Sequence, residues 1–132
     1  MNISGRPAVQ PHQSAKPDPG QVLTTAVLRA ADIMQLNQAT LAQVLGVSPA
    51  SISRMRNGAY RLVPSGKEWE LATLLVRLFR GLDAIMAGDE AALRSWLDSY
   101  NAALHDKPRA LLTQAAGLTR TVDYVDGFRA RV

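Results

Sequence analysis

The sequence predicts an all-α protein in which an N-terminal helix-turn-helix bundle is joined by a long helix to a small C-terminal helical domain. Three observations support this fold class. Alanine and leucine are abundant, whereas aromatic residues make up only 5% of the 132 residues, and this composition favours helices over sheets. Apolar residues recur at the spacing of a helix face. Serine, asparagine, proline and glycine, which cap or end helices, separate these segments.

The chain divides into four segments by composition. They are a flexible tail (1–20), a helix-turn-helix domain (21–66), a long connecting helix (67–88) and a C-terminal domain (89–132). The tail holds four of the seven prolines and few large apolar side chains, so it cannot offset the entropy lost on ordering. The expected helices are Gln21–Gln35, Gln38–Leu45, Pro49–Asn57, Lys67–Ala87, Glu90–Ser99, Pro108–Ala116 and Leu118–Ala130.

The segment Gln38–Asn57 meets the geometric requirements of a helix-turn-helix. Ala42 is small where the two helix backbones cross, and Gly46 suits the left-handed residue of the turn. Ile52 and Met55 recur at the spacing that packs the second helix onto the first. The combined spacing is specific to this motif, which commonly binds DNA.

Charge along the chain supports a polyanion-binding face. Between Ile33 and Lys67 there is no acidic residue. The basic residues of this stretch are Arg54, Arg56, Arg61 and Lys67. A local excess of this kind favours contact with a polyanion, although chance clustering in a solvated loop is the alternative.

With Ile52 and Met55 turned inwards, small side chains and one arginine remain on the outer face of the second helix. This face consists of Pro49, Ala50, Ser51, Ser53, Arg54 and Asn57. We expect Arg54 to contact a base edge, that of guanine. Ser48, Ser51 and Ser53 are expected to reach bases or phosphates, and Gln38, Arg56 and Arg61 to reach phosphates. The alternative is a helical hairpin that serves only packing or protein contact.

The helix expected at Lys67–Ala87 is apolar nearly all round between Leu71 and Phe79. Such a helix is either central to a core or shared between subunits, and the short chain favours a shared role. DNA recognition by this motif uses two half-sites about one helical turn apart. We therefore expect a homodimer, with Lys67–Ala87 as its main contact.

The C-terminal segment carries helix boundaries but no catalytic pattern. Asp89 caps one helix, Pro108 opens the next, and Gly117 is expected to close it. Trp96, at helical spacing with its leucine neighbours, is read as a core residue. The segment holds no paired carboxylates, Ser/His/Asp arrangement or metal-ligand cluster, so we expect no enzyme activity, no cofactor, no metal and no small-molecule substrate.

Several other classes are excluded by simple features. The absence of cysteine excludes disulfides and thiolate metal sites. No apolar run approaches the roughly 20 residues of a membrane span, so no membrane association is expected. Residues 1–20 lack the apolar core of a secretory signal, and the bacterial cytoplasm is the expected location.

Two segments also resemble known families. Gln38–Asn57 is similar to the Xre/Cro-type helix-turn-helix, whose second helix reads DNA. Residues of about 80–132 resemble the toxin-binding C-terminal domain of Xre/MbcA/ParS antitoxins. The matching landmarks, in order, are Ser95-Trp96-Leu97, Asn101, Lys107 to Thr113, Gly117, Val122 and Tyr124 to Arg129. Members usually have a glycine in the turn before the proline, where this chain has His105-Asp106-Lys107.

The resemblance implies a partner, namely a RES-domain toxin that consumes NAD or transfers ADP-ribose from it. It also implies that the C-terminal end of the antitoxin reaches the NAD site of the toxin and blocks it. The residues that this assigns to toxin binding are Arg109, Tyr124, Phe128, Arg129, Arg131 and Val132. A cationic tail with a terminal carboxylate suits a nucleotide pocket. The alternative is that Arg129 and Arg131 only offset the dipole of the last helix.

The expected function is therefore that of an antitoxin, which inhibits a RES-domain toxin and represses its own operon by binding operator DNA. Two alternatives remain open at this point. One is a stand-alone Xre-type dimeric repressor without a toxin. The other is a toxin-binding protein whose helix-turn-helix serves only for assembly.

Overall fold

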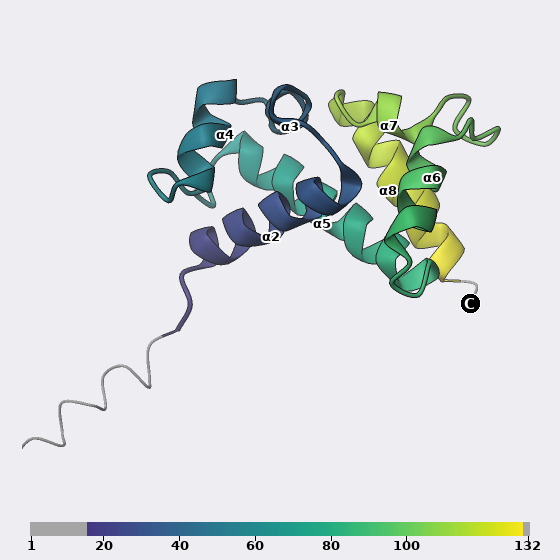
Figure 1. Cartoon of the computed structure of the whole chain (residues 1–132), viewed down its shortest axis with the longest axis horizontal. Helices are drawn as coiled ribbons and strands as arrows, with labels where there is room; N and C mark the ends of the chain where they lie inside the picture. Colours follow the sequence, from purple (N-terminus) through teal and green to yellow (C-terminus); the bar gives the residue numbers. More distant parts are fainter. Residues whose placement is uncertain (1–15, 131–132) are drawn as a thin grey trace, which may run out of the picture.

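The computed structural model describes residues 16–130, and within them it is all-α, as predicted (Figure 1). Its helices are α2 (Pro19–Met34), α3 (Gln38–Leu45), α4 (Pro49–Arg56), α5 (Lys67–Ile85), α6 (Glu90–Asp98), α7 (Pro108–Leu111) and α8 (Ala115–Arg129). Among these residues the one β-type pairing is an isolated bridge between Asn101 and Asp106. None of the described helices is long and apolar enough to cross a membrane.

Side-chain caps begin four of the helices, and three of the caps follow the sequence prediction. Asn37, Ser48 and Asp89 accept hydrogen bonds from the backbone amides three residues ahead, at 2.8, 3.1 and 3.0 Å. Each bond satisfies a backbone donor that the first turn of a helix leaves free. The fourth cap is Asp18, whose side chain accepts from the amide of Gln21 at 2.9 Å.

The cap at Asp18 corrects the predicted boundary of the tail. Asp18 is followed by Pro19 at the first helical position, where a proline loses no hydrogen bond. The helix therefore begins at Pro19 rather than Gln21, and Pro19 and Gly20 do not belong to a flexible tail. The rest of the predicted tail that precedes Lys16 lies outside the described residues.

Helix α5 is the centre of the molecule, with α2 and α3 on one side and α8 on the other (Figure 1). Leu75, Leu78 and Leu82 are fully buried along it, and a single apolar core runs from Val27 to Val125. Of the two alternatives for this helix, a core position within the chain is therefore confirmed.

The prediction that Gly117 closes a helix is wrong. Helix α7 ends at Leu111, and Gly117 lies buried in the first turn of α8. A Cβ atom at Gly117 would collide with the carbonyl oxygen of Leu111. Glycine is required here because α7 and α8 approach closely at this position, rather than because the chain turns or hinges.

Candidate nucleic-acid interface and C-terminal apolar surface

Helices α3 and α4 form the helix-turn-helix from the residues that the sequence indicated. Ala42 and Ile52 are buried between the two helices. Gly46 has φ 72°, the left-handed conformation that ends α3. Met55 is also buried, so the opposite side of α4 is turned to solvent. This arrangement leaves the N-terminal half of α4 and the start of α3 accessible on one surface.

The exposed side of α4 is organised by hydrogen bonds from neighbouring polar groups. The side-chain amide nitrogen of Gln38, Nε2, donates to the carbonyl oxygen of Pro49 at 2.8 Å and to the hydroxyl of Ser53 at 2.7 Å. Gln38 thus ties the start of α3 to the first turns of α4. Pro49, Ala50, Ser53, Arg54 and Asn57 are exposed, and Ser51 is half-buried.

A short hydrogen-bonded chain holds Arg54 on this surface. The hydroxyls of Ser48 and Ser51 lie 3.0 Å apart, and the Arg54 guanidinium donates to Ser51 at 3.1 Å. Within residues 16–130 no carboxylate forms an ion pair with Arg54. Its guanidinium therefore keeps donors free for an incoming acceptor.

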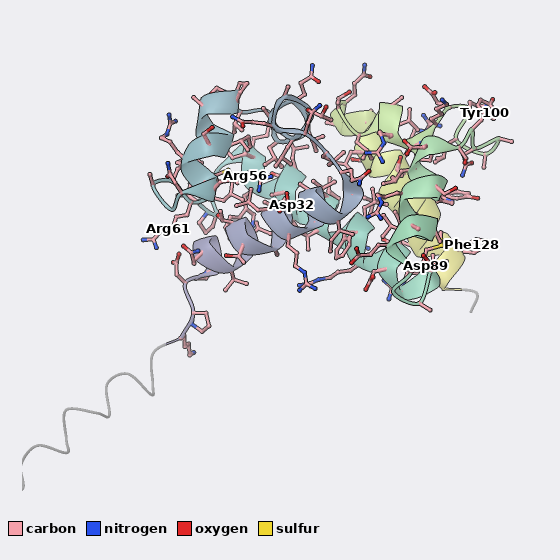
Figure 2. All side chains as sticks on the ribbon, in the orientation of Figure 1. Asp32, Arg56, Arg61, Asp89, Tyr100 and Phe128 are labelled. Atoms are coloured by element: carbon pink, nitrogen blue, oxygen red, sulfur yellow. The ribbon has the colours of Figure 1, made fainter. Side chains whose placement is uncertain are left out.

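The two other arginines predicted near this surface already have acidic neighbours. Arg56 pairs with Asp32 of α2 at 2.9 Å, and the two side chains point toward one another in Figure 2. Arg61 lies 3.5 Å from Asp18. Both acids stand outside the stretch from Ile33 to Lys67, so the sequence pattern overstated the local positive charge. Phosphate contacts by Arg56 and Arg61 remain predictions.

Arg109 connects the C-terminal helices to α2. Its guanidinium pairs with Asp98 of α6 and donates to the carbonyl oxygen of Met34 at 2.8 Å. Arg94 of α6 donates to the carbonyl oxygen of Ile33 at 3.0 Å. Helix α2 has no basic residue in its last turn. These two arginines of the C-terminal domain therefore supply donors to the carbonyl oxygens at its C-terminus.

The same contact shifts the ionisation of the partner acid. The hydrogen bond from Arg109 lowers the pKa of Asp98 below its usual value, because it stabilises the carboxylate. Arg109 thus has a role within the chain that the sequence pattern did not reveal. Its assignment to toxin contact stays a prediction.

The other half of the C-terminal domain presents an apolar surface. Trp96, Tyr124 and Phe128 stack in a row with ring centroids 6.4 Å apart in each pair. Together with four aliphatic residues they line a cavity of about 160 Å³. The aliphatic residues are Leu82, Ile85, Met86 and Val125. Trp96 was predicted as a core residue, but it is only half-buried and forms part of this open cavity.

Phe128 is the most accessible member of this row. Its side chain is 49% exposed at the C-terminal end of α8, where it projects from the domain (Figure 2). Arg129 follows it and is also exposed. The predicted toxin-binding residues Arg131 and Val132 lie outside the described residues. The sequence analysis did not assign Ile85 and Met86 to this cavity. The pattern of α5 alone does not reveal that α6 and α8 leave the C-terminal end of α5 uncovered.

The described part of the chain offers no site for a metal ion. No group of three or more His, Asp or Glu residues is placed there to hold one. His105 lies exposed in the turn before α7.

Comparison with known families matches both halves of the chain. Residues 13–77 match the antitoxin Xre-like helix-turn-helix domain. Residues 78–131 match the antitoxin Xre/MbcA/ParS C-terminal toxin-binding domain. No curated protein matches the chain. The two matched regions are contiguous and meet within α5, and neither family is catalytic. The chain therefore belongs to the Xre/MbcA/ParS family of antitoxins, with a helix-turn-helix DNA-binding domain followed by a toxin-binding domain.

Proposed function

We propose that this antitoxin binds and inhibits a RES-domain toxin and represses its own operon as a homodimer on operator DNA, in the cytoplasm. The observation that carries the proposal is the adjacency of two matched domains, an Xre-like helix-turn-helix and a toxin-binding domain, along residues 13–131. A stand-alone repressor would have no need of the second domain.

For DNA recognition, the support is the outer surface of α4. Arg54 has free donors and is held by Ser51, which in turn contacts Ser48. An arginine fixed in this way loses little side-chain freedom when it forms two hydrogen bonds to guanine. Gln38 fixes α4 relative to α3 and stands at a helix N-terminus, where a phosphate is favoured.

For toxin inhibition, the support is the end of α8. Phe128 and Tyr124 offer an apolar anchor beside the cavity between α5, α6 and α8. The residues after Phe128 then extend toward the toxin. In this proposal Arg129 and Arg131 pair with acids of the NAD site, and Val132 enters the same site.

The DNA part is tested by fluorescence anisotropy with a duplex from the promoter of the antitoxin's own operon. Replacing Arg54 by alanine is expected to weaken binding about 10- to 100-fold, since a bidentate base contact contributes ~1–3 kcal/mol. Arg120→Ala, in the C-terminal domain, is the matched control and is expected to bind as the wild type does. Equal binding by wild type and Arg54→Ala would remove Arg54 as a base reader, and no binding by either would refute the repressor role.

The toxin part is tested with a RES protein encoded in the same operon. Deleting Arg129 to Val132 is expected to abolish inhibition of NAD consumption while the toxin is still bound. Phe128→Ser is expected to weaken toxin binding by about 10-fold or more, because it removes an apolar anchor. Full inhibition by the shortened chain would refute the role of the tail. Operator binding in an operon without a RES gene would favour the stand-alone repressor.

A further inference from the structure

The apolar cavity beside Phe128 lies where three helices meet. Helix α5 ends at Ile85, and the chain then turns into α6 through Ala87 and Gly88, which both have positive φ. Both α6 and α8 pack against α5, and α8 does so more extensively. The side chains at the end of α5 therefore line a cavity between α6 and α8, which we call the Phe128 cavity.

The Phe128 cavity has a buried floor and an accessible rim. Leu82 and Val125 form the floor and belong to the core of the protein. The other lining residues are half-buried or exposed, namely Ile85, Met86, Trp96, Tyr124 and Phe128. None of the lining residues is charged. An apolar group can therefore enter from solvent and reach the core without displacing a charged side chain.

The volume of the Phe128 cavity suits one large side chain. It is about 160 Å³. An apolar cavity of about 150 Å³ is large enough to bind benzene, and the phenylalanine side chain carries the same ring. The stacked rings of Trp96 and Tyr124 offer favourable aromatic contacts to an inserted ring. The cavity therefore fits a single phenylalanine or leucine side chain rather than a whole helix.

The place of the Phe128 cavity in the chain indicates which partner supplies this side chain. All of its lining residues lie within residues 78–131, which match the toxin-binding domain. The cavity also lies at the opposite end of the molecule from α4, so an occupant leaves the outer face of α4 free (Figure 1). A nucleic acid is disfavoured, because no basic residue lines the cavity.

We propose that the bound toxin inserts one large apolar side chain, a phenylalanine or a leucine, into the Phe128 cavity. The inference rests on the proposed function and deepens it, because it adds the chemistry of the toxin residue. The antitoxin provides the pocket, and Phe128 forms part of its rim. A side chain buried in such a pocket contributes a large share of the affinity of a protein interface.

The first test uses benzene and the free antitoxin, so that it does not depend on a toxin. Methyl NMR is expected to show saturable shifts at Leu82, Ile85, Met86 and Val125 as benzene is added. Ile85→Trp places a larger side chain at the rim and is expected to abolish these shifts at the remaining methyl groups. Absence of saturable shifts in the wild type would overturn the proposal, because the cavity would then not admit an apolar group.

The second test is the affinity for the toxin encoded in the same operon, measured by isothermal titration calorimetry. Ile85→Trp and Met86→Trp are each expected to weaken binding by about 10- to 100-fold, since each excludes a large apolar side chain from a buried site. Gln43→Trp adds a tryptophan to an exposed position of α3 and is the matched control, with wild-type affinity expected. Circular dichroism verifies that each variant is folded.

A double-mutant cycle identifies the inserted side chain. Exposed phenylalanine and leucine residues of the toxin are replaced by alanine one at a time. The substitution of the inserted residue is expected to weaken binding to the wild-type antitoxin by about 10-fold or more. The same substitution is expected to cause little further loss with Ile85→Trp, because the two changes remove the same contact.

The remaining outcomes separate this proposal from the proposed function. Full toxin affinity in both Ile85→Trp and Met86→Trp would overturn the cavity proposal and leave toxin inhibition standing. Additive losses for every toxin substitution would also overturn it. Self-association of the free antitoxin that Ile85→Trp abolishes would place a second copy in the cavity instead. A wild type that binds benzene but not the toxin would contradict the proposed function itself.

Discussion

Arg109 illustrates how a single residue can support two parts of the molecule at once. Its guanidinium spans from the Asp98 carboxylate to the carbonyl oxygens of Met34 and Gln35, at the end of the helix that leads into α3. Only a quarter of its side chain is exposed, so these contacts are partly protected from water. Its loss would leave the carbonyl oxygen of Met34 without this donor and the carboxylate of Asp98 unpaired beside it.

We therefore expect Arg109→Ala to lower the free energy of unfolding by about 1–3 kcal/mol, as is usual for a partly buried charge-assisted hydrogen bond. Arg109→Lys keeps the charge but not the bidentate geometry, and it is expected to give an intermediate loss in the free energy of unfolding. Urea unfolding measures both. Variants as stable as the wild type would contradict the assignment of Arg109 as a link between the two domains.

The same contact predicts a pH dependence. Because the pKa of Asp98 is lower in the folded chain than in the unfolded chain, the pair stabilises the fold above the unfolded value of about 4. This contribution is lost as the pH falls through the lowered pKa. NMR titration of the Asp98 carboxyl is expected to show a higher pKa in Arg109→Ala than in the wild type. An unchanged titration would mean that Arg109 does not cause the shift.

His105 occupies a conformation that most residues avoid. Its φ is 62°, in the left-handed region, within the exposed turn that leads to α7. Glycine adopts that conformation without steric cost. His105→Gly is therefore expected to raise the free energy of unfolding by about 0.5–1 kcal/mol. His105→Ala keeps the Cβ atom and serves as the control, with no gain expected in thermal unfolding.

At the scale of helices, the α7–α8 junction depends on one close approach. Gly117→Ala would place a Cβ atom against the carbonyl oxygen of Leu111, and backbone cannot move aside as a flexible side chain can. We expect a loss of about 2–3 kcal/mol in the free energy of unfolding. Gly127→Ala in the same helix meets no atom within 4 Å and is expected to gain about 0.5–1 kcal/mol, because alanine favours helix.

The helices show what could be predicted from the sequence and what could not. Asn37, Ser48 and Asp89 act locally, so their caps were evident from neighbouring residues. Gly117 was misplaced because its requirement comes from a contact between helices, which leaves no mark on local periodicity. The link from Arg109 to Met34 was invisible for the same reason, since it joins residues far apart in the chain.

The residues of the candidate sites also divide into those that local sequence predicts and those that depend on contacts between helices. The outer face of α4 was predicted from helical spacing alone, because Ile52 and Met55 determine which side is buried. The acidic partners Asp32 and Asp18 of Arg56 and Arg61 were missed, since they come from another helix or its cap. The apolar cavity at Phe128 likewise requires knowledge of where three helices end.

At the scale of the whole molecule, the two matched domains share one core. The family boundary between residues 77 and 78 falls inside α5, whose buried residues Leu75, Leu78 and Leu82 lie on both sides of it. Arg94 and Arg109 add polar contacts from the second domain to the end of α2. The two domains differ in function, but the apolar core is continuous between them.

This shared core predicts that the chain unfolds as one cooperative unit. The urea unfolding curves recorded by circular dichroism and by tryptophan fluorescence should coincide. Trp69 and Trp96 report on the two ends of α5, and the helix signal reports on both domains.

A fragment ending at residue 77 would lose α8 and half of α5, and would expose Leu75 and the neighbouring apolar face. We expect it to lack a cooperative transition, whereas Gly127→Ala in the full chain keeps a single one. Two separate transitions in the wild type, or a fragment 1–77 with a sharp native-like transition, would show that each domain folds alone.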